Sequence, residues 1–244
     1  MSTYVIGDLH GQYQSLKQCL ARCNFDYNQD TLIQLGDVVD GGDEVFDCVE
    51  ELLKIKNLVT LKGNHDDWFL DFIKTGFHPA AWAYGGVSTI NSYATKAGKV
   101  PVTRKTRQGY KTSFNPEDIP IAHRQFFESQ RLNHIDKNNN CFVHAGFNPF
   151  QPFHEQPATI FYWDRILWQS AMNWQTKANQ NSEIEPFGIV TKFNNIFIGH
   201  TNTMLWGIDK PLKAANIYNI DTGASKGGKL TIMNVDSKHF WQSE

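Results

Sequence analysis

Three side chains that can bind metal ions follow segments with the pattern of buried strands. Asp8, Asp37 and Asn64 each come directly after an alternating or apolar run that ends in glycine. In open α/β sheets, ligands bind beyond the carboxyl ends of the strands. The three side chains are therefore expected to meet at one edge of a sheet.

Three histidines occupy similar positions. His10 lies in the turn after Asp8, and His144 and His200 follow apolar runs further along the chain. Each of these residues has a simpler explanation when it is taken alone. A carboxylate can cap a helix, an asparagine can adopt a left-handed turn, and a single histidine can be a hydrogen-bonded structural residue. Their convergence on one expected edge favours a metal site.

The chemistry of these ligands predicts the metals. Carboxylate, amide and imidazole groups suit Mn, Fe or Zn. Six groups exceed what one tetrahedral ion needs, so we predict two ions that share one carboxylate, roughly 3.5–4 Å apart. Asp37, from the central strand, is the expected shared ligand. The others divide into Asp8 and His10 for one ion, and Asn64, His144 and His200 for the other.

Two ions at that spacing favour phosphoester hydrolysis. They lower the pKa of a bridging water, and the resulting hydroxide can attack phosphorus in line. His65, next to Asn64, is the expected general acid for the departing alkoxide. Asp40 is expected to orient His65 through a carboxylate–imidazole hydrogen bond and to raise the pKa of the histidine.

The order of these motifs resembles a known family, the calcineurin-like metallophosphoesterases. The motifs are Gly7–Gly11, Gly36–Asp40, Gly63–Asp66, His144–Gly146 and Gly199–Thr201. Within that family the chain resembles the small bacterial and phage serine/threonine phosphatases of the phosphoprotein phosphatase branch. The symmetrical diadenosine tetraphosphatases are near relatives of these enzymes. The resemblance implies a four-layer α/β/β/α sandwich, two metal ions, often Mn, and direct hydrolysis of phosphomonoesters.

The chain departs from the family pattern at Gly41, where the family usually has an arginine that binds the substrate phosphate. Loss of that guanidinium removes a bidentate phosphate ligand. We expect Arg165, which matches a second phosphate-binding arginine of the family, to be the main phosphate ligand and Lys62 a weaker one. We also expect the basic stretch Lys96–Lys111 to gather anionic substrate over the metals.

The hydrophobic periodicity predicts the elements that position these residues. Three strands that end at Gly7, Asp37 and Gly63 alternate with helices, which implies a parallel sheet with helices on both faces. Residues 77–130 are expected to form a mainly helical cap or insertion, with a polar loop near Lys96–Asn115. Later strands are expected to form a second, more antiparallel sheet; they are predicted at Cys141–His144, Ile196–Ile198, Ile217–Ile220 and Leu230–Val235. We expect one domain, residues 1–244.

Composition limits the other possibilities. Lys and Arg total 23 and Asp and Glu 25, and this net charge of −2 argues against general binding of nucleic acid or membrane surfaces. Four cysteines without C-x-x-C spacing are expected to be buried thiols. No signal peptide or membrane-spanning run is evident, so a cytoplasmic protein is expected.

Three functions remain open. The first is a protein serine/threonine phosphatase-like phosphomonoesterase, acting on a phosphorylated protein, a peptide or a small phosphoester. The second is a symmetrical dinucleoside tetraphosphatase, for which Trp82, Tyr84 or Trp68 could stack on a base. The third is a weakly catalytic, phosphate-binding regulatory module. An intact ligand set together with His65 argues against the third.

Overall fold

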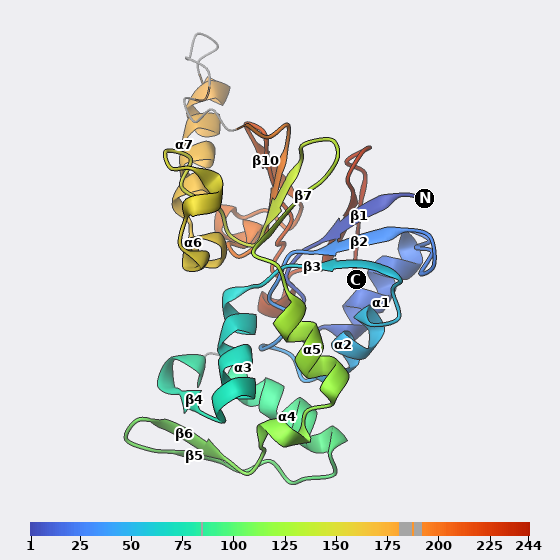
Figure 1. Cartoon of the computed structure of the whole chain (residues 1–244). Coiled ribbons are helices and arrows are strands. Elements are labelled where there is room, and N and C mark those ends of the chain that lie inside the picture. Colours follow the sequence, from blue (N-terminus) through green and yellow to red (C-terminus); the bar gives the residue numbers. More distant parts are fainter. Residues whose placement is uncertain (84, 181–186, 188–191) are drawn as a thin grey trace.

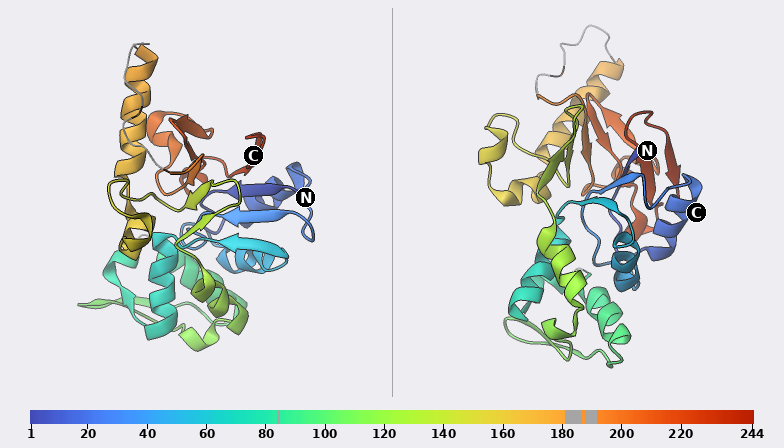
Figure 2. Two further views of the ribbon diagram at one scale, coloured as in Figure 1. Left: turned by 45° about the horizontal axis from the view of Figure 1, so that its top comes forward. Right: turned by 45° about the vertical axis from the view of Figure 1, so that its right-hand side comes forward.

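The computed structural model describes the chain except for residues 84, 181–186 and 188–191. Two five-stranded sheets pack face to face, and helices cover the outer face of each (Figures 1 and 2). The helices are α1 (Tyr13–Arg22), α2 (Val45–Leu52), α3 (Asn64–Thr75), α4 (Gly86–Lys96), α5 (Ile121–Ser129), α6 (Ala158–Trp163) and α7 (Ile166–Gln180). The strands are β1 (Thr3–Ile6), β2 (Thr31–Gln34), β3 (Asn57–Thr60), β4 (His78–Pro79), β5 (Thr103–Lys105), β6 (Gly109–Thr112), β7 (Asn133–Ile135), β8 (Cys141–Val143), β9 (Ile196–Ile198), β10 (Leu212–Ala214), β11 (Ile217–Asn219), β12 (Thr231–Asn234) and β13 (Phe240–Gln242).

The first sheet has the order β13-β12-β1-β2-β3. Strands β1, β2 and β3 are parallel, so their carboxyl ends lie at one edge, as the alternation of strands and helices predicts. The strand predicted at 230–235 is β12, and it pairs antiparallel with β1. Its assignment to the second sheet was wrong because a short connection does not decide which sheet a strand joins.

The second sheet has the order β10-β11-β9-β8-β7. Its three central strands, β11, β9 and β8, are parallel, and only the outer pairs β10–β11 and β7–β8 are antiparallel. The prediction of a second, more antiparallel sheet was therefore wrong for its centre. The parallel centre puts the ends of β8 and β9 side by side, with His144 directly after β8.

Three apolar clusters hold the layers together. One lies between the first sheet and helices α1 to α5, and another between the second sheet and helices α6 and α7. The third joins the two sheets: Phe142 and Phe197, which stack side by side in the second sheet with ring centroids 4.9 Å apart, belong to one cluster with Val5 of the first sheet. The four-layer α/β/β/α arrangement is confirmed. The expectation of helices on both faces of the first sheet was wrong, because Val5, Ile33 and Leu61 pack that face against the second sheet.

The segment between α3 and β7 contains more sheet than the sequence predicts. The expected polar loop near 96–115 includes β5 and β6, which form a three-stranded sheet with β4. β4 follows the C-terminal end of α3, whereas Asn64 begins that helix. The hairpin of β5 and β6 lies beyond the C-terminal end of α3 (Figure 1), whereas His78 of β4 contacts Trp82 with ring centroids 4.3 Å apart.

The contacts of the basic residues in 96–111 give no support to their expected action over the metals, which stays a prediction. Lys96 and Lys99 are paired with Asp47 and Asp118. None of these basic residues lines the pocket described below. Elsewhere in the described chain the four cysteines are buried and free, and no helix is long and apolar enough to cross a membrane.

We predict that Phe197→Ala lowers the free energy of unfolding by about 3–5 kcal/mol, because Phe197 is fully buried between the sheets and its loss leaves a cavity. Urea unfolding followed by circular dichroism measures this change. The matched control is Phe150→Ala, since that ring is 81% exposed. Equal unfolding midpoints for the two variants would contradict the assigned interface.

Candidate active site

Asp37 lies at the centre of the strand edge, in the loop after β2. Its Oδ1 accepts the backbone N–H of His65 at 2.9 Å. Its Oδ2 lies 3.3 Å from His144 Nε2 and 3.8 Å from His10 Nε2. Burial opposes ionisation of Asp37, but the charges of His144 and His65 outweigh it and hold the pKa of this carboxyl well below its usual range.

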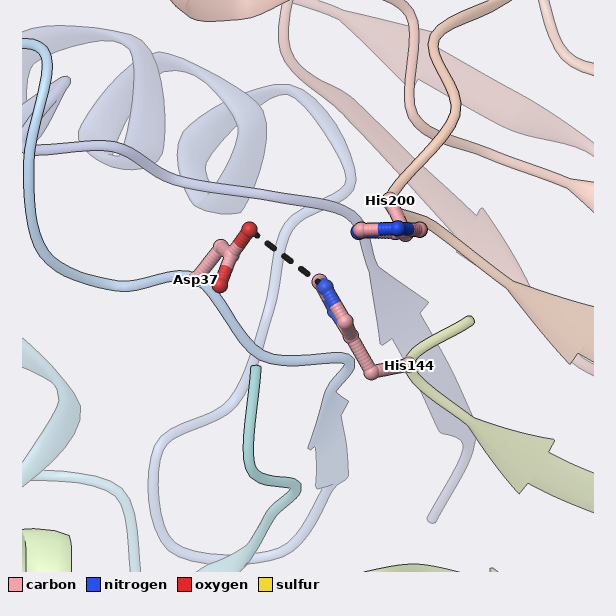
Figure 3. A group of neighbouring side chains, drawn as sticks. All are labelled: Asp37, His144 and His200. Atoms are coloured by element: carbon pink, nitrogen blue, oxygen red, sulfur yellow. Dashed lines mark ion pairs between the residues drawn. The ribbon is translucent and has the colours of Figure 1, made fainter. Parts of the chain in front are cut away.

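Two groups of possible metal ligands share this carboxylate. Asp8, His10 and Asp37 form one group, and Asp37, His144 and His200 form the other (Figure 3). Within each group the ligand atoms lie within 4.8 Å of one another. Asn64 adjoins the second group, since its Oδ1 is 3.3 Å from His144 Nε2. This grouping matches the division of ligands between two ions predicted from the sequence, and the ligand roles remain predictions.

Backbone carbonyls fix the orientation of two of the histidines. His10 Nδ1 is 3.0 Å from the Val39 carbonyl oxygen, and His144 Nδ1 is 2.8 Å from that of Leu35. A carbonyl only accepts, so each Nδ1 carries the hydrogen and donates it. In each ring Nε2 is then the nitrogen that faces Asp37 and is placed to bind a metal ion, with Nδ1 held by the backbone as is usual for a metal-binding histidine.

Two further observations fit divalent cations at this position. His200 Nε2 is buried and has no hydrogen-bond partner among the described residues, which costs free energy unless a ligand binds there. Burial, together with the neighbouring His144 and Arg165, lowers the pKa of His200 to about 2, so its imidazole is neutral. The pKa of Asp8 is raised well above its usual value by burial and by the nearby carboxylates of Asp221 and Asp37. A cation would relieve both costs.

Close backbone approach explains the glycines that precede the ligands. A Cβ on Gly63 would lie 2.0 Å from Asp37 Oδ1, and a Cβ on Gly199 would lie 2.1 Å from Asp8 Oδ1. Asp8 also accepts the backbone N–H of His200 at 3.0 Å, which ties the end of β1 to the end of β9. The two sheets are thus held together at the site itself.

The backbone at this edge is strained. Of the eight non-glycine residues with positive φ in the described chain, four are His10, Asp37, Asp40 and His200. Such conformations cost about 1–3 kcal/mol each and gather at functional sites. Asp66 helps to hold them, since it accepts the N–H groups of Val38 and Gly63 at 2.9 and 3.1 Å. Asp66 therefore fixes the loop that carries Asp37.

His65 and Asp40 form a pair beside the ligands. His65 Nδ1 lies 2.6 Å from Asp40 Oδ2. Burial disfavours the charged imidazole, but Asp37 and the bond to Asp40 prevail and raise the pKa of His65 to about 9. Asp40 in turn accepts hydrogen bonds from Trp82 Nε1 at 2.9 Å and from Thr89 Oγ1 at 2.6 Å. Trp82 and Thr89 come from the segment after α3 and fix the carboxylate that orients His65.

A polar cavity of about 180 Å³ opens onto these groups. Its lining includes Arg165, which also donates to Thr201 Oγ1 at 2.9 Å. Lys62 is not among the lining residues; its ammonium pairs with Asp67 at 3.3 Å. Arg165 therefore stays the candidate phosphate ligand, whereas the geometry gives Lys62 another partner.

Five further residues line the cavity without a role predicted from the sequence, and they are Asn202, Asp221, Gly223, Ser225 and Lys226. Asp221 could have been found, because it follows a predicted strand as Asp8 and Asp37 do. Ser225 and Lys226 lie in a short 3₁₀ turn with no comparable pattern, and only the fold brings them to the site.

The comparisons with known proteins agree with this geometry. The sequence pattern of the calcineurin-like phosphoesterases matches residues 1–204. The chain belongs to this family. It is a metal-dependent phosphatase, a phosphoester hydrolase of a family that uses dinuclear divalent metal sites.

Individual relatives differ in the substrate that their names state. Serine/threonine-protein phosphatase 1 of Salmonella typhimurium is 24% identical over 95% of this chain and 91% of that protein. The symmetrical bis(5′-nucleosyl)-tetraphosphatase of Actinobacillus succinogenes is 25% identical over 99% of this chain and 96% of that protein. A cold-active protein-tyrosine phosphatase of a psychrophilic Shewanella shares the fold, with a TM-score of 0.61, 14% identity and coverage of 100% of this chain and 80% of that one. Phosphoester hydrolysis follows from the family match, and the different names of these relatives leave the substrate open.

We predict that Thr89→Val lowers kcat about tenfold or more, because Asp40 loses a charge-assisted hydrogen bond and orients His65 less well. Thr89→Ser keeps the hydroxyl and is the matched control. Steady-state kinetics on an aryl phosphate with Mn gives the comparison. If valine and serine had the same kcat, Thr89 would have no part in positioning Asp40.

Proposed function

We propose that this chain is a serine/threonine phosphatase-like phosphomonoesterase that uses two divalent cations, Mn in the first place and Fe or Zn as alternatives. One observation carries the proposal. Two ligand groups share Asp37, and the His65–Asp40 pair lies directly beside them in one polar cavity. That combination supports attack of water on a phosphate ester and protonation of the leaving group.

The residues of the site have separate roles in this reaction. Asp37, Asp8 and His10 would hold one cation, and Asp37, Asn64, His144 and His200 the other. When bound, the cations polarise the phosphoryl group and activate water as a nucleophile. Arg165 binds oxygens of the substrate phosphate through its guanidinium. As water adds to phosphorus and the P–O bond breaks, His65 gives its proton to the departing alkoxide, while Asp40 holds the imidazole through Nδ1.

The lining of the cavity supports a phosphomonoester of a protein or peptide. It contains no Phe, Tyr or Trp among the described residues, and its volume of about 180 Å³ is small. A phosphorylated serine or threonine side chain needs little more than room for the phosphate. A dinucleotide needs surfaces on which its bases can stack.

The symmetrical dinucleoside tetraphosphatase is the second candidate, and the rim of the site favours it. Trp163 is 43% exposed and contacts both Trp68 and His200, with ring centroids 5.5 and 5.9 Å apart. Trp68 in turn contacts His65. Trp82 is fully buried and cannot stack on a ligand, and Tyr84 lies outside the described residues. A base would therefore stack on Trp163.

A weakly catalytic regulatory module is the least supported function. The pair of His65 and Asp40, with Asp40 held by Trp82 and Thr89, is an arrangement that phosphate binding alone does not require.

The deciding experiment is a substrate panel with Mn. It contains phosphoserine, phosphothreonine and phosphotyrosine peptides, diadenosine tetraphosphate and an aryl phosphate. We expect the highest kcat/KM on the phosphoserine or phosphothreonine peptides. His65→Asn and Asp37→Asn are expected to lower kcat at least a hundredfold, since each removes a group that acts in the transition state.

Preferred hydrolysis of diadenosine tetraphosphate, with a KM that rises in Trp163→Ala, would replace the first proposal by the second. Full activity of Asp37→Asn would contradict the use of a shared carboxylate. Phosphate binding without turnover of any substrate would favour the regulatory module.

A further inference from the structure

We propose that Lys226 is a substrate-binding residue, whose ammonium binds oxygens of the substrate phosphate from a different element than Arg165. The inference rests on the proposed function, because it concerns the anion that this site accepts. It assigns a role to the turn Ala224–Lys226, which follows β11 and precedes β12.

Lys226 lies at the cavity that the metal-binding candidates line. It shares the lining with Asp37, His65 and Arg165. Within the part of the chain that the structure describes, Arg165 and Lys226 are the two Lys or Arg residues of that lining. Arg165 comes from the junction of α6 and α7, so the two cations reach the cavity from separate parts of the fold.

Internal hydrogen bonds fix the turn that carries Lys226. The backbone N–H groups of Lys226 and Gly228 both donate to the Gly223 carbonyl, at 2.8 and 2.9 Å. The N–H of Gly223 donates to Asp221 Oδ1 at 3.0 Å, and Asp221 itself lines the cavity. The backbone of the turn is therefore tied to the site, and only the lysine side chain remains free to adjust.

The same turn packs against the loop that carries Asp37 and Asp40. A Cβ built on Gly41 would lie 3.2 Å from the Cβ of Ser225 and 3.2 Å from the Cβ of His10. Gly41 also has a φ of +84°, which strains any other residue. The cavity therefore receives no cationic side chain from position 41, and the residue after Ser225 supplies one.

The charge of Lys226 is available for a ligand. The side chain is exposed, and its ammonium takes part in no ion pair with any carboxylate of the described chain. This separates it from Lys62, Lys96 and Lys99, which are each paired with an aspartate. A lysine is a point charge on a flexible stem, so it can follow a phosphate of variable position more easily than an arginine.

The test compares Lys226→Met with Lys229→Met. The second variant removes the same charge three residues further along the chain, at a residue that does not line the cavity. We measure KM and kcat on an aryl phosphate with Mn. Binding of inorganic phosphate is measured by isothermal titration calorimetry, which needs no turnover. Lys226→Met is expected to raise KM and the phosphate Kd about tenfold, as for loss of a charge-assisted hydrogen bond, while kcat changes less than threefold. Lys226→Arg is expected to restore most of the affinity.

An unchanged phosphate Kd and KM in Lys226→Met, or equal losses in Lys226→Met and Lys229→Met, would overturn the role of Lys226. The proposed function fails in a different way. If the unaltered protein turned over no phosphoester, the function would be wrong, and the calorimetry would still decide whether Lys226 binds phosphate.

Discussion

The site depends on one buried carboxylate that several elements must approach at once. Asp37 accepts a backbone N–H from the start of α3, and it faces histidines that follow β1 and β8. A buried carboxylate with these neighbours is ionised and needs positive charge around it. The two sheets, the glycines at their edges and the orientation of the histidines place candidate cation ligands around Asp37.

The architecture explains how this is achieved with short segments. Parallel β1, β2 and β3 end side by side, and β8 and β9 end against them from the second sheet. Gly63 and Gly199 let the backbone come within contact of the carboxylates, and the loops accept unfavourable φ values at four of the functional positions. The unfavourable backbone conformations destabilise the fold where the ligand atoms are placed. Burial of the three apolar clusters offsets this cost elsewhere.

The sequence predicts the parts of the site that follow from strand ends. Asp8, Asp37, Asn64, His144 and His200 share one simple rule, which is a polar ligand directly after an apolar run, and the structure brings them together. Sheet membership does not follow from such a rule. The strand at 231–234 joins β1 through pairing with a distant segment, and no local pattern contains that information.

Electrostatic roles are the least predictable from sequence. Lys62 has the right charge and lies next to a motif, yet Asp67 on the next turn neutralises it. The basic residues of the hairpin at 103–112 do not line the cavity, which composition alone does not predict. Lys226 has no distinguishing neighbours in sequence and reaches the cavity only because its turn packs on Gly41.

The central claim is that the Asp37 carboxylate binds two cations at the same time. Electron paramagnetic resonance of the protein loaded with two equivalents of Mn(II) tests this most directly, because ions that share a carboxylate roughly 3.5–4 Å apart are magnetically coupled. The account predicts the multiline spectrum of an exchange-coupled pair. The spectrum of two isolated Mn(II) ions would contradict it.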